Sequence, residues 1–205
     1  MDEAPGRTAG GGGQRVIALD LPRAEPLSDA TEGYFRKCEE KLGLLPNVLL
    51  AYAFDEKKLR CFTDMYNDLM LGESGLTKLE REMIAVTVSS ANRCHYCLVA
   101  HGAAVRELSG DPELGDTIAL SWRAASLSPR HRAMLEFAWK LTERPFDVGP
   151  ADREALFAAG FSDRDVWDIA SVVGFFNMSN RVATATSMRP NPEYHDRGRS
   201  RADPA

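Results

Sequence analysis

Residues 77–101 read TKLEREMIAVTVSSANRCHYCLVAH, and this stretch decides the fold. It opens on Thr77 with Glu80 three residues later, a pattern typical of a capping box, in which the two side chains satisfy free amides at a helix start. The apolar residues that follow recur every three or four positions, which is the helical period. The run SSANR at 89–93 is a poor helix former. We therefore predict two helices joined by a tight turn.

The same helical period continues on both sides of this stretch, and no segment alternates convincingly at the strand period. Ser128 before Pro129 and a capping residue at Ser162 mark further helix starts, while Gly110 and Gly160 can end helices. The sequence predicts an all-α fold, a multi-helix bundle of seven or eight helices. The expected helical ranges are 28–42, 46–54, 56–71, 77–91, 94–108, 114–124, 129–143, 151–159 and 162–186. Some of these ranges would be single turns and not full helices.

Three apolar stripes at helical spacing are interpreted as core faces and not as cofactor-binding surfaces. Cys38 and Cys61 are interpreted in the same way, because an isolated cysteine at helical spacing usually behaves as a small hydrophobic residue. The stripes consist of Leu59, Phe62, Tyr66 and Leu69; of Met134, Phe137, Ala138 and Leu141; and of Val166, Ile169, Val173 and Phe176.

Composition limits the classes of function. The 205 residues are 44% apolar and carry a net charge of −5, from 25 basic and 30 acidic residues, so we expect no nucleic acid partner. No apolar run approaches the roughly 20 residues that span a bilayer, and the N-terminus lacks the order of a secretory signal. We expect a cytoplasmic protein without a membrane partner. It would have a flexible Gly-rich leader at 1–15, a single domain at 16–195 and a polar tail at 196–205.

The candidate reactive groups are Cys94, Cys97 and His101. Two cysteines separated by two residues in a reducing compartment are more often catalytic or metal-binding than structural. The spacing of three and then four residues places all three side chains on one face of a helix. Asn92 tolerates the left-handed conformation that often ends a helix, so we place the turn there. An antiparallel hairpin then sets Glu82 at the depth of His101, since both are about equally far from the turn.

This geometry favours thiol redox chemistry. A thiolate is the nucleophile, and an ordinary thiol is mostly protonated at neutral pH. The start of a helix supplies partial positive charge to both cysteines, His101 can accept the proton, and Glu82 would orient the imidazole. The expected cycle runs from thiolate attack on a peroxide to a sulfenic acid and then to a disulfide, which an external dithiol or thiol protein reduces. We expect no bound cofactor and no metal.

Cys94-x-x-Cys97 follows Glu82 by twelve residues, and His101 follows Cys97 by four. This pattern resembles the signature of the alkylhydroperoxidase D-like group in the carboxymuconolactone decarboxylase superfamily. LLPNV at 44–48 and FFNMSNR at 175–181 are similar to segments of its peroxidase-related branch, so the resemblance covers roughly residues 30–195. It implies an all-helical subunit, peroxidase activity drawn from the cysteine pair, and homo-oligomers, commonly trimers or hexamers, with a dimer also possible. It further implies that Cys97 attacks the peroxide and Cys94 resolves the intermediate.

One position departs from the family pattern, in which a histidine stands directly before the second cysteine. Here that residue is Tyr96, and His95 comes one place earlier. His95 would point away from the reactive face, which favours a surface or interface role. Tyr96 either hydrogen-bonds the substrate or packs as an amphipathic residue.

Three other functions remain open. A zinc site could use Cys94, Cys97, His101 and, as the fourth ligand, Glu82. A non-enzymatic redox sensor would form the disulfide once, with the conformational change as its output. The decarboxylase activity that names the superfamily is disfavoured, because that branch does not depend on a cysteine pair. We predict a thiol-dependent peroxidase.

Overall fold

The computed structural model describes residues 15–200. The expected leader therefore lies almost wholly outside the described residues, as does the end of the expected tail. Within the described range the chain forms nine α-helices and three short 3-10 helices and no strand, so the all-α prediction is confirmed. The elements are α1 Asp29–Leu42, α2 Asn47–Tyr52, α3 Glu56–Leu71, α4 Lys78–Ala91, α5 His95–Ser109, α6 Leu114–Ser121, η1 Trp122–Ala124, α7 Pro129–Glu143, η2 Pro145–Asp147, α8 Pro150–Ala158, α9 Asp163–Ala185 and η3 Pro192–His195.

The predicted capping residues begin the helices. At α4 the Thr77 amide donates to Glu80 Oε2 over 2.8 Å, and the Glu80 amide donates back to Thr77 Oγ1 over 3.1 Å. Ser162 and Asp165 form the same reciprocal box at α9, and the Ser128 hydroxyl accepts from a first-turn amide of α7. Each cap satisfies amides that a helix start leaves without partners.

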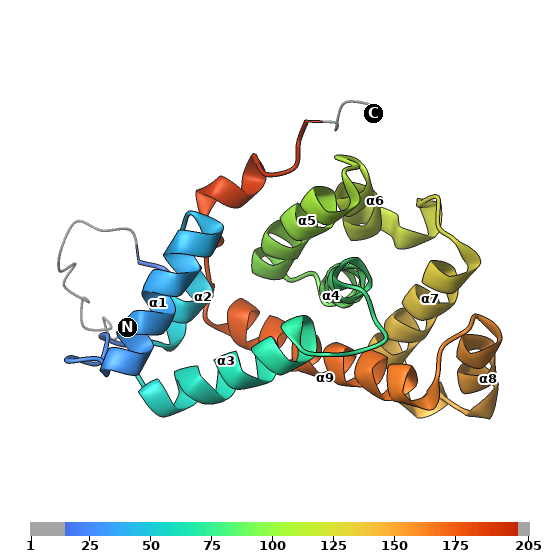
Figure 1. The fold of residues 1–205 in the computed structure, drawn as a ribbon, viewed down its shortest axis with the longest axis horizontal. Coiled ribbons are helices and arrows are strands. Elements are labelled where there is room, and N and C mark those ends of the chain that lie inside the picture. The colour runs from blue at the N-terminus through green and yellow to red at the C-terminus, as the bar shows by residue number, and fades with distance from the viewer. Residues whose placement is uncertain (1–14, 201–205) are drawn as a thin grey trace, which may run out of the picture.

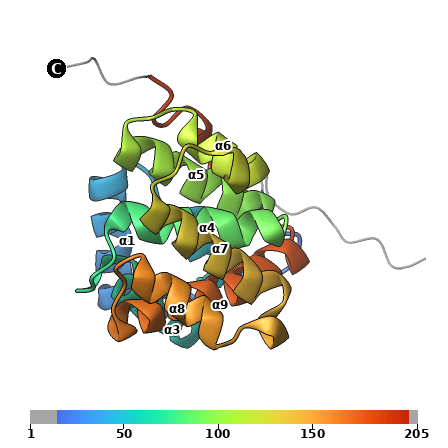
Figure 2. The same ribbon diagram turned by 90° about the vertical axis from the view of Figure 1, so that its right-hand side faces the viewer.

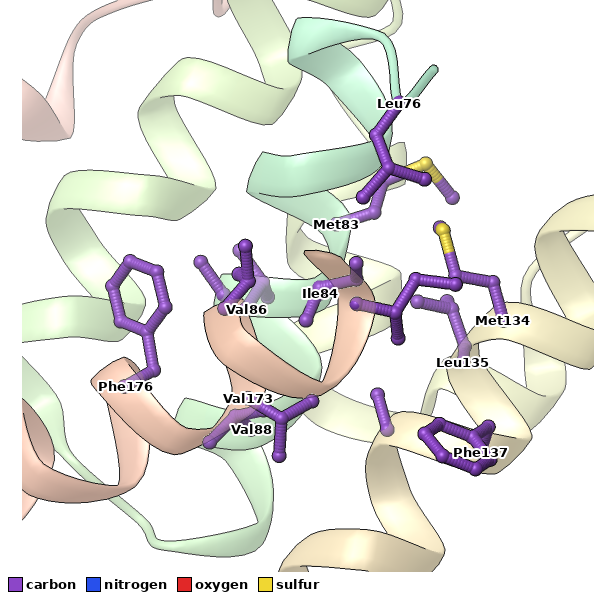
Figure 3. Packing of buried hydrophobic residues seen from close by; sticks show 14 of the residues in the cluster. Leu76, Met83, Ile84, Val86, Val88, Met134, Leu135, Phe137, Val173 and Phe176 are labelled. Atoms are coloured by element: carbon purple, nitrogen blue, oxygen red, sulfur yellow. The ribbon is translucent and has the colours of Figure 1, made fainter. Parts of the chain in front are cut away.

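Helix α4 lies at the centre of the bundle, where α5, α6, α7 and α9 contact it (Figure 1). In the view of Figure 2, α4 crosses the middle of the molecule with α5 above it and α9 below. Every residue from Glu80 to Ser89 is buried, as expected of a helix that is enclosed on all sides. Figure 3 shows the core around it, with side chains from α4, α7 and α9: Met83, Ile84, Val86, Val88, Met134, Leu135, Phe137, Val173 and Phe176.

The turn between α4 and α5 is where it was predicted, but its left-handed residue is Arg93 (φ 54°) and not Asn92, which stays in the right-handed helical region. The Cys94 amide donates to Ser89 O and the Arg93 amide to Ser90 O, which together form a Schellman motif. This motif puts the left-handed conformation one residue after the helix cap. Asn92 is the cap itself, so Cys94 becomes the N-cap of α5.

The C-terminal segment packs beside α5 and the end of α1. The buried Arg106 donates from Nη2 to Tyr194 O over 3.0 Å and from Nε to Arg197 O over 2.9 Å. Arg197 in turn donates to Leu42 O at the end of α1. These bonds hold η3 and the residues after it against the helices that carry the candidate site (Figure 1).

Between residues 15 and 200, none of the helices combines the length and the apolar character needed to cross a membrane.

Candidate active site

The α4–α5 hairpin brings Glu82 and His101 together. His101 Nδ1 lies 2.6 Å from Glu82 Oε2, and each side chain is only 12% exposed. When Nδ1–H donates to the carboxylate, Nε2 is the nitrogen left to accept or deliver a proton. Nε2 has no hydrogen-bond partner within residues 15–200.

Cys94 and Cys97 lie at the start of α5, and both are free thiols buried to 1% exposure. A hydrogen bond from Cys97 lowers the pKa of Cys94 to about 6, with the Cys97 amide, Thr184 and His101 also lowering it against the effect of burial. The pKa of Cys97 is raised well above its usual value, first by its hydrogen bond to Cys94 and then by burial. The two sulfurs thus share one proton and, near neutral pH, one negative charge.

Helix α9 supplies polar groups that the sequence did not single out. Ser179 and Asn180 each lower the pKa of Cys97 by hydrogen bonding. Asn180 is held in place because its Nδ2 donates to Ser89 Oγ over 3.0 Å and its Oδ1 accepts from Asn92 Nδ2 over 3.0 Å. The segment 175–181 was recognised only by resemblance. Ser179 and Asn180 are two adjacent small polar residues on the buried face of α9, shortly after the buried Phe175 and Phe176, and this pattern is the sequence signal that could have identified them.

A cavity of about 380 Å³ opens next to the reactive groups. Cys97, His101 and Glu82 line it, whereas Cys94 does not. The rest of the wall is mainly aliphatic and aromatic, and comes from α1, α2, α3, α5, α9 and the C-terminal segment: Leu42, Leu49, Phe62, Met70, Ala103, Phe175, Phe176 and Tyr194 among others. The cavity is large enough for an organic molecule and is not limited to a water-sized ligand.

Aromatic contacts fix the orientation of the imidazole. The Phe176 ring meets His101 edge-on with ring centroids 4.6 Å apart, and Phe175 meets Phe176 in the same manner at 5.3 Å. Edge-to-face contacts of this kind favour one relative orientation of the rings. The imidazole is therefore held by a carboxylate on one side and a phenyl ring on the other.

His95 is exposed, which agrees with its predicted surface position. Tyr96 is buried and its hydroxyl accepts from the Val48 amide over 3.0 Å, which agrees with its interpretation as a packing residue.

The core assignment of Cys61 was wrong, because this residue is exposed on the outer side of α3. Cys38 is half-buried and lines the cavity, so its environment is the wall of the candidate site.

The zinc alternative finds no support in the arrangement of side chains. Within residues 15–200, no group of three or more His, Cys, Asp or Glu residues is placed to hold a metal ion. Glu82 reaches His101, but these two and the sulfurs do not converge as a tetrahedral set would require.

Comparison with known proteins places the chain in a family. The model of the carboxymuconolactone decarboxylase family matches residues 57–140. A peroxidase-related protein from Silicibacter sp. TM1040 is 61% identical, with a TM-score of 0.88, over 93% of this chain and 100% of that one. A peroxidase-related protein from Ralstonia eutropha JMP134, described as an alkylhydroperoxidase AhpD core, is 40% identical, with the same TM-score and the same coverage. The debrominase Bmp8, 18% identical over 89% of this chain and 94% of its own with a TM-score of 0.71, shares the fold. The chain belongs to the alkylhydroperoxidase D-like proteins of the carboxymuconolactone decarboxylase superfamily.

Proposed function

We propose that the protein is a thiol-dependent peroxidase that reduces organic hydroperoxides through a Cys94–Cys97 redox disulfide. One observation carries the proposal: a largely apolar cavity ends on a buried thiol next to a histidine–carboxylate pair. The relationship to peroxidase-related proteins at 61% and 40% identity supports it.

The attacking sulfur is assigned to Cys97, because it lines the cavity and Cys94 does not. The charge shared by the pair rests mainly on Cys94, which must take the Cys97 proton before attack. The Cys97 thiolate that results is stabilised by Ser179 and Asn180. It attacks the outer oxygen of the hydroperoxide, the O–O bond breaks, and Cys97 becomes a sulfenic acid. His101 Nε2 delivers a proton to the departing oxygen, which leaves as an alcohol.

The second step closes the disulfide. Cys94 attacks the sulfenic sulfur of Cys97 and water leaves, so the peroxide's two oxidising equivalents end in the S–S bond. The two residues are three positions apart across the first turn of α5, within reach of each other. An external dithiol or thiol protein then reduces the disulfide, and the proton-handling pair Glu82 and His101 returns to its starting state.

The test is dithiol-dependent consumption of an organic hydroperoxide by the wild type, Cys97→Ser and Cys94→Ser. We expect turnover by the wild type, none by Cys97→Ser, and at most a single sulfenic acid equivalent from Cys94→Ser. The metal content of the same preparations is measured alongside. Stoichiometric zinc without turnover would replace the proposal with the metal-binding alternative.

The redox sensor differs from the enzyme in recycling. A disulfide that peroxide forms once, and that no dithiol reduces at a useful rate, would favour the sensor. Exposed Cys61 provides an internal check, because its oxidation would also consume peroxide. The Cys61→Ala variant should turn over at the wild-type rate if Cys94 and Cys97 alone carry the reaction.

We also propose that the subunits form a homo-oligomer, as the resemblance implies. Three large apolar side chains are strongly exposed in the single subunit: Leu120 at 87%, Phe146 at 82% and Trp167 at 72%. Side chains of this type are enriched at subunit contacts. Sedimentation of the wild type and of Trp167→Ser gives the mass of the assembly, and a monomer at all concentrations would contradict this part.

A further inference from the structure

The cavity contains a phenol that the reaction described above leaves unused. Tyr66, on α3, lines the cavity with Cys97, Glu82 and His101. Within residues 15–200, its hydroxyl has no hydrogen-bond partner. Tyr66 is half-buried and its hydroxyl is not sealed off by other atoms, so it is open to a ligand or water in the cavity.

The surroundings of Tyr66 keep this hydroxyl protonated. Burial raises its pKa well above the usual value, and the negative charge of Glu82 raises it further. The other groups that act on it electrostatically, Tyr194, Tyr34 and Tyr96, also line the cavity. Tyr66 thus offers the cavity a neutral donor on which the charge of Glu82 acts.

The Tyr66 ring is fixed by the aromatic cluster that fixes the imidazole. Its centroid lies 6.0 Å from Phe175 and 6.4 Å from Phe62. Phe175 contacts Phe176, which contacts His101. Tyr66 and His101 are therefore held at two ends of one chain of rings, which limits how far either can move from the other.

The other cavity phenols are less suited to the same task. The Tyr34 hydroxyl donates to Asn67 Oδ1 over 3.3 Å and is therefore occupied. Tyr194 has the Arg197 guanidinium 5.6 Å from its ring centroid, and Arg197 acts on it more strongly than Glu82 does. The charge that acts most strongly on the Tyr66 hydroxyl is instead Glu82, which belongs to the reactive end.

We propose that Tyr66 is a further catalytic residue, whose hydroxyl donates a hydrogen bond to the hydroperoxide oxygen that departs when Cys97 attacks. The inference rests on the proposed peroxidase function and adds to it. As the S–O bond forms and the O–O bond breaks, negative charge develops on the departing alkoxide. The Tyr66 hydrogen bond stabilises this charge and His101 supplies the proton that completes the alcohol, so Tyr66 itself stays neutral. A fixed donor aimed at developing charge in a water-poor site is an effective form of catalysis.

The experiment compares Tyr66→Phe with Tyr52→Phe. Tyr52 stacks on Phe62 in the same ring cluster, with centroids 4.6 Å apart, but it does not line the cavity. The reduced enzymes are mixed with excess hydroperoxide, and the rate constant for oxidation is measured in a single turnover, separately from reduction by dithiol. We expect Tyr66→Phe to lower the oxidation rate constant at least about 10-fold while the reduction rate stays constant. Tyr52→Phe should oxidise at the wild-type rate.

A second substrate distinguishes hydrogen bonding from a general structural defect. A peroxy acid releases a carboxylate, which is a much weaker base than an alkoxide and needs less stabilisation as it leaves. The loss in Tyr66→Phe should therefore be several-fold smaller with a peroxy acid than with an alkyl hydroperoxide. An equal loss with both substrates would overturn the proposal, as would an unchanged rate or a loss found in Tyr194→Phe instead. If the wild type does not turn over, or Cys97→Ser does, it is the proposed function that fails.

Discussion

Two buried glutamates on α4, Glu80 and Glu82, differ by two positions in the chain and lie in entirely different surroundings. Both oxygens of Glu80 have structural partners: Oε2 accepts from the Thr77 amide and Oε1 from Arg130 Nε, each over 2.8 Å. Glu82 has one oxygen bound to His101 and faces a cavity. The same type of side chain therefore acts as a helix cap at Glu80 and as the partner of a reactive imidazole at Glu82.

The difference comes from what each position meets. A step of two residues turns the side chain by roughly 200° about the helix axis, so the two carboxylates project on nearly opposite sides. One side meets Arg130 of α7, whose guanidinium also lies 3.6 Å above the Phe161 ring. The other side meets α5 and the cavity. Burial alone does not identify a catalytic acid. The hydrogen-bond partners of its two oxygens show whether a buried carboxylate has a structural role or is available for chemistry.

The largest effect is expected from Glu82→Gln. The amide keeps the size of the side chain but removes the charged acceptor that orients His101 through its Nδ1. We expect kcat/KM for hydroperoxide to fall about 100-fold, with little change in the free energy of unfolding. Steady-state kinetics and urea denaturation of the same preparation test both parts. Unchanged kinetics would mean that the pair is structural, as Glu80 is.

Glu80→Gln should give the opposite result. An amide at this position turns one acceptor into a donor facing either the Thr77 amide or Arg130, so we expect a loss of about 2 kcal/mol in the free energy of unfolding. Activity per folded molecule should remain at the wild-type level. If activity falls more than stability can explain, the contrast between the two glutamates is wrong.

The pH dependence of thiol oxidation tests the groups that face the cavity. The lowered pKa of Cys94, about 6, means that the thiol pair keeps its shared charge at neutral pH and loses it as the pH falls through that value. The rate of oxidation by peroxide should fall about tenfold for each pH unit below about 6. In Cys94→Ser the remaining thiol is buried, and the midpoint should move to higher pH. Stopped-flow oxidation across the pH range measures both profiles.

The smallest effect is expected on the capping side. Thr77→Ala removes the hydroxyl that accepts from the Glu80 amide over 3.1 Å. We expect a loss of about 1 kcal/mol in stability and no change in kcat/KM. Thermal denaturation and the peroxide assay check the two halves. A loss of activity would show that the start of α4 also controls the position of Glu82.

Local signals made much of this molecule predictable. The boxes at Thr77 and Ser162 and the left-handed Gly110 mark helix ends within a residue or two, because caps depend on neighbouring groups alone. The hairpin that joins Glu82 to His101 followed from counting residues on either side of a turn. Such inferences need no knowledge of distant contacts.

Features that depend on distant contacts were not predictable. Tyr66 belongs to an apolar stripe that predicts a core position. Only the packing of α3 against α9 shows that this side chain lines a cavity. Asn92 adopts a right-handed conformation while its side chain bonds Asn177 and Asn180 on α9, two residues more than eighty positions away in the chain. A single sequence contains no local signal for such pairs.

The anchored C-terminal segment has a consequence for the order in which the protein is made. Tyr194 and Arg197 form part of the cavity wall, and they are held there by Arg106 from the middle of the chain. A ribosome releases the hairpin with both cysteines roughly a hundred residues before it releases this wall. During synthesis, the thiols are therefore present well before the cavity next to them is complete.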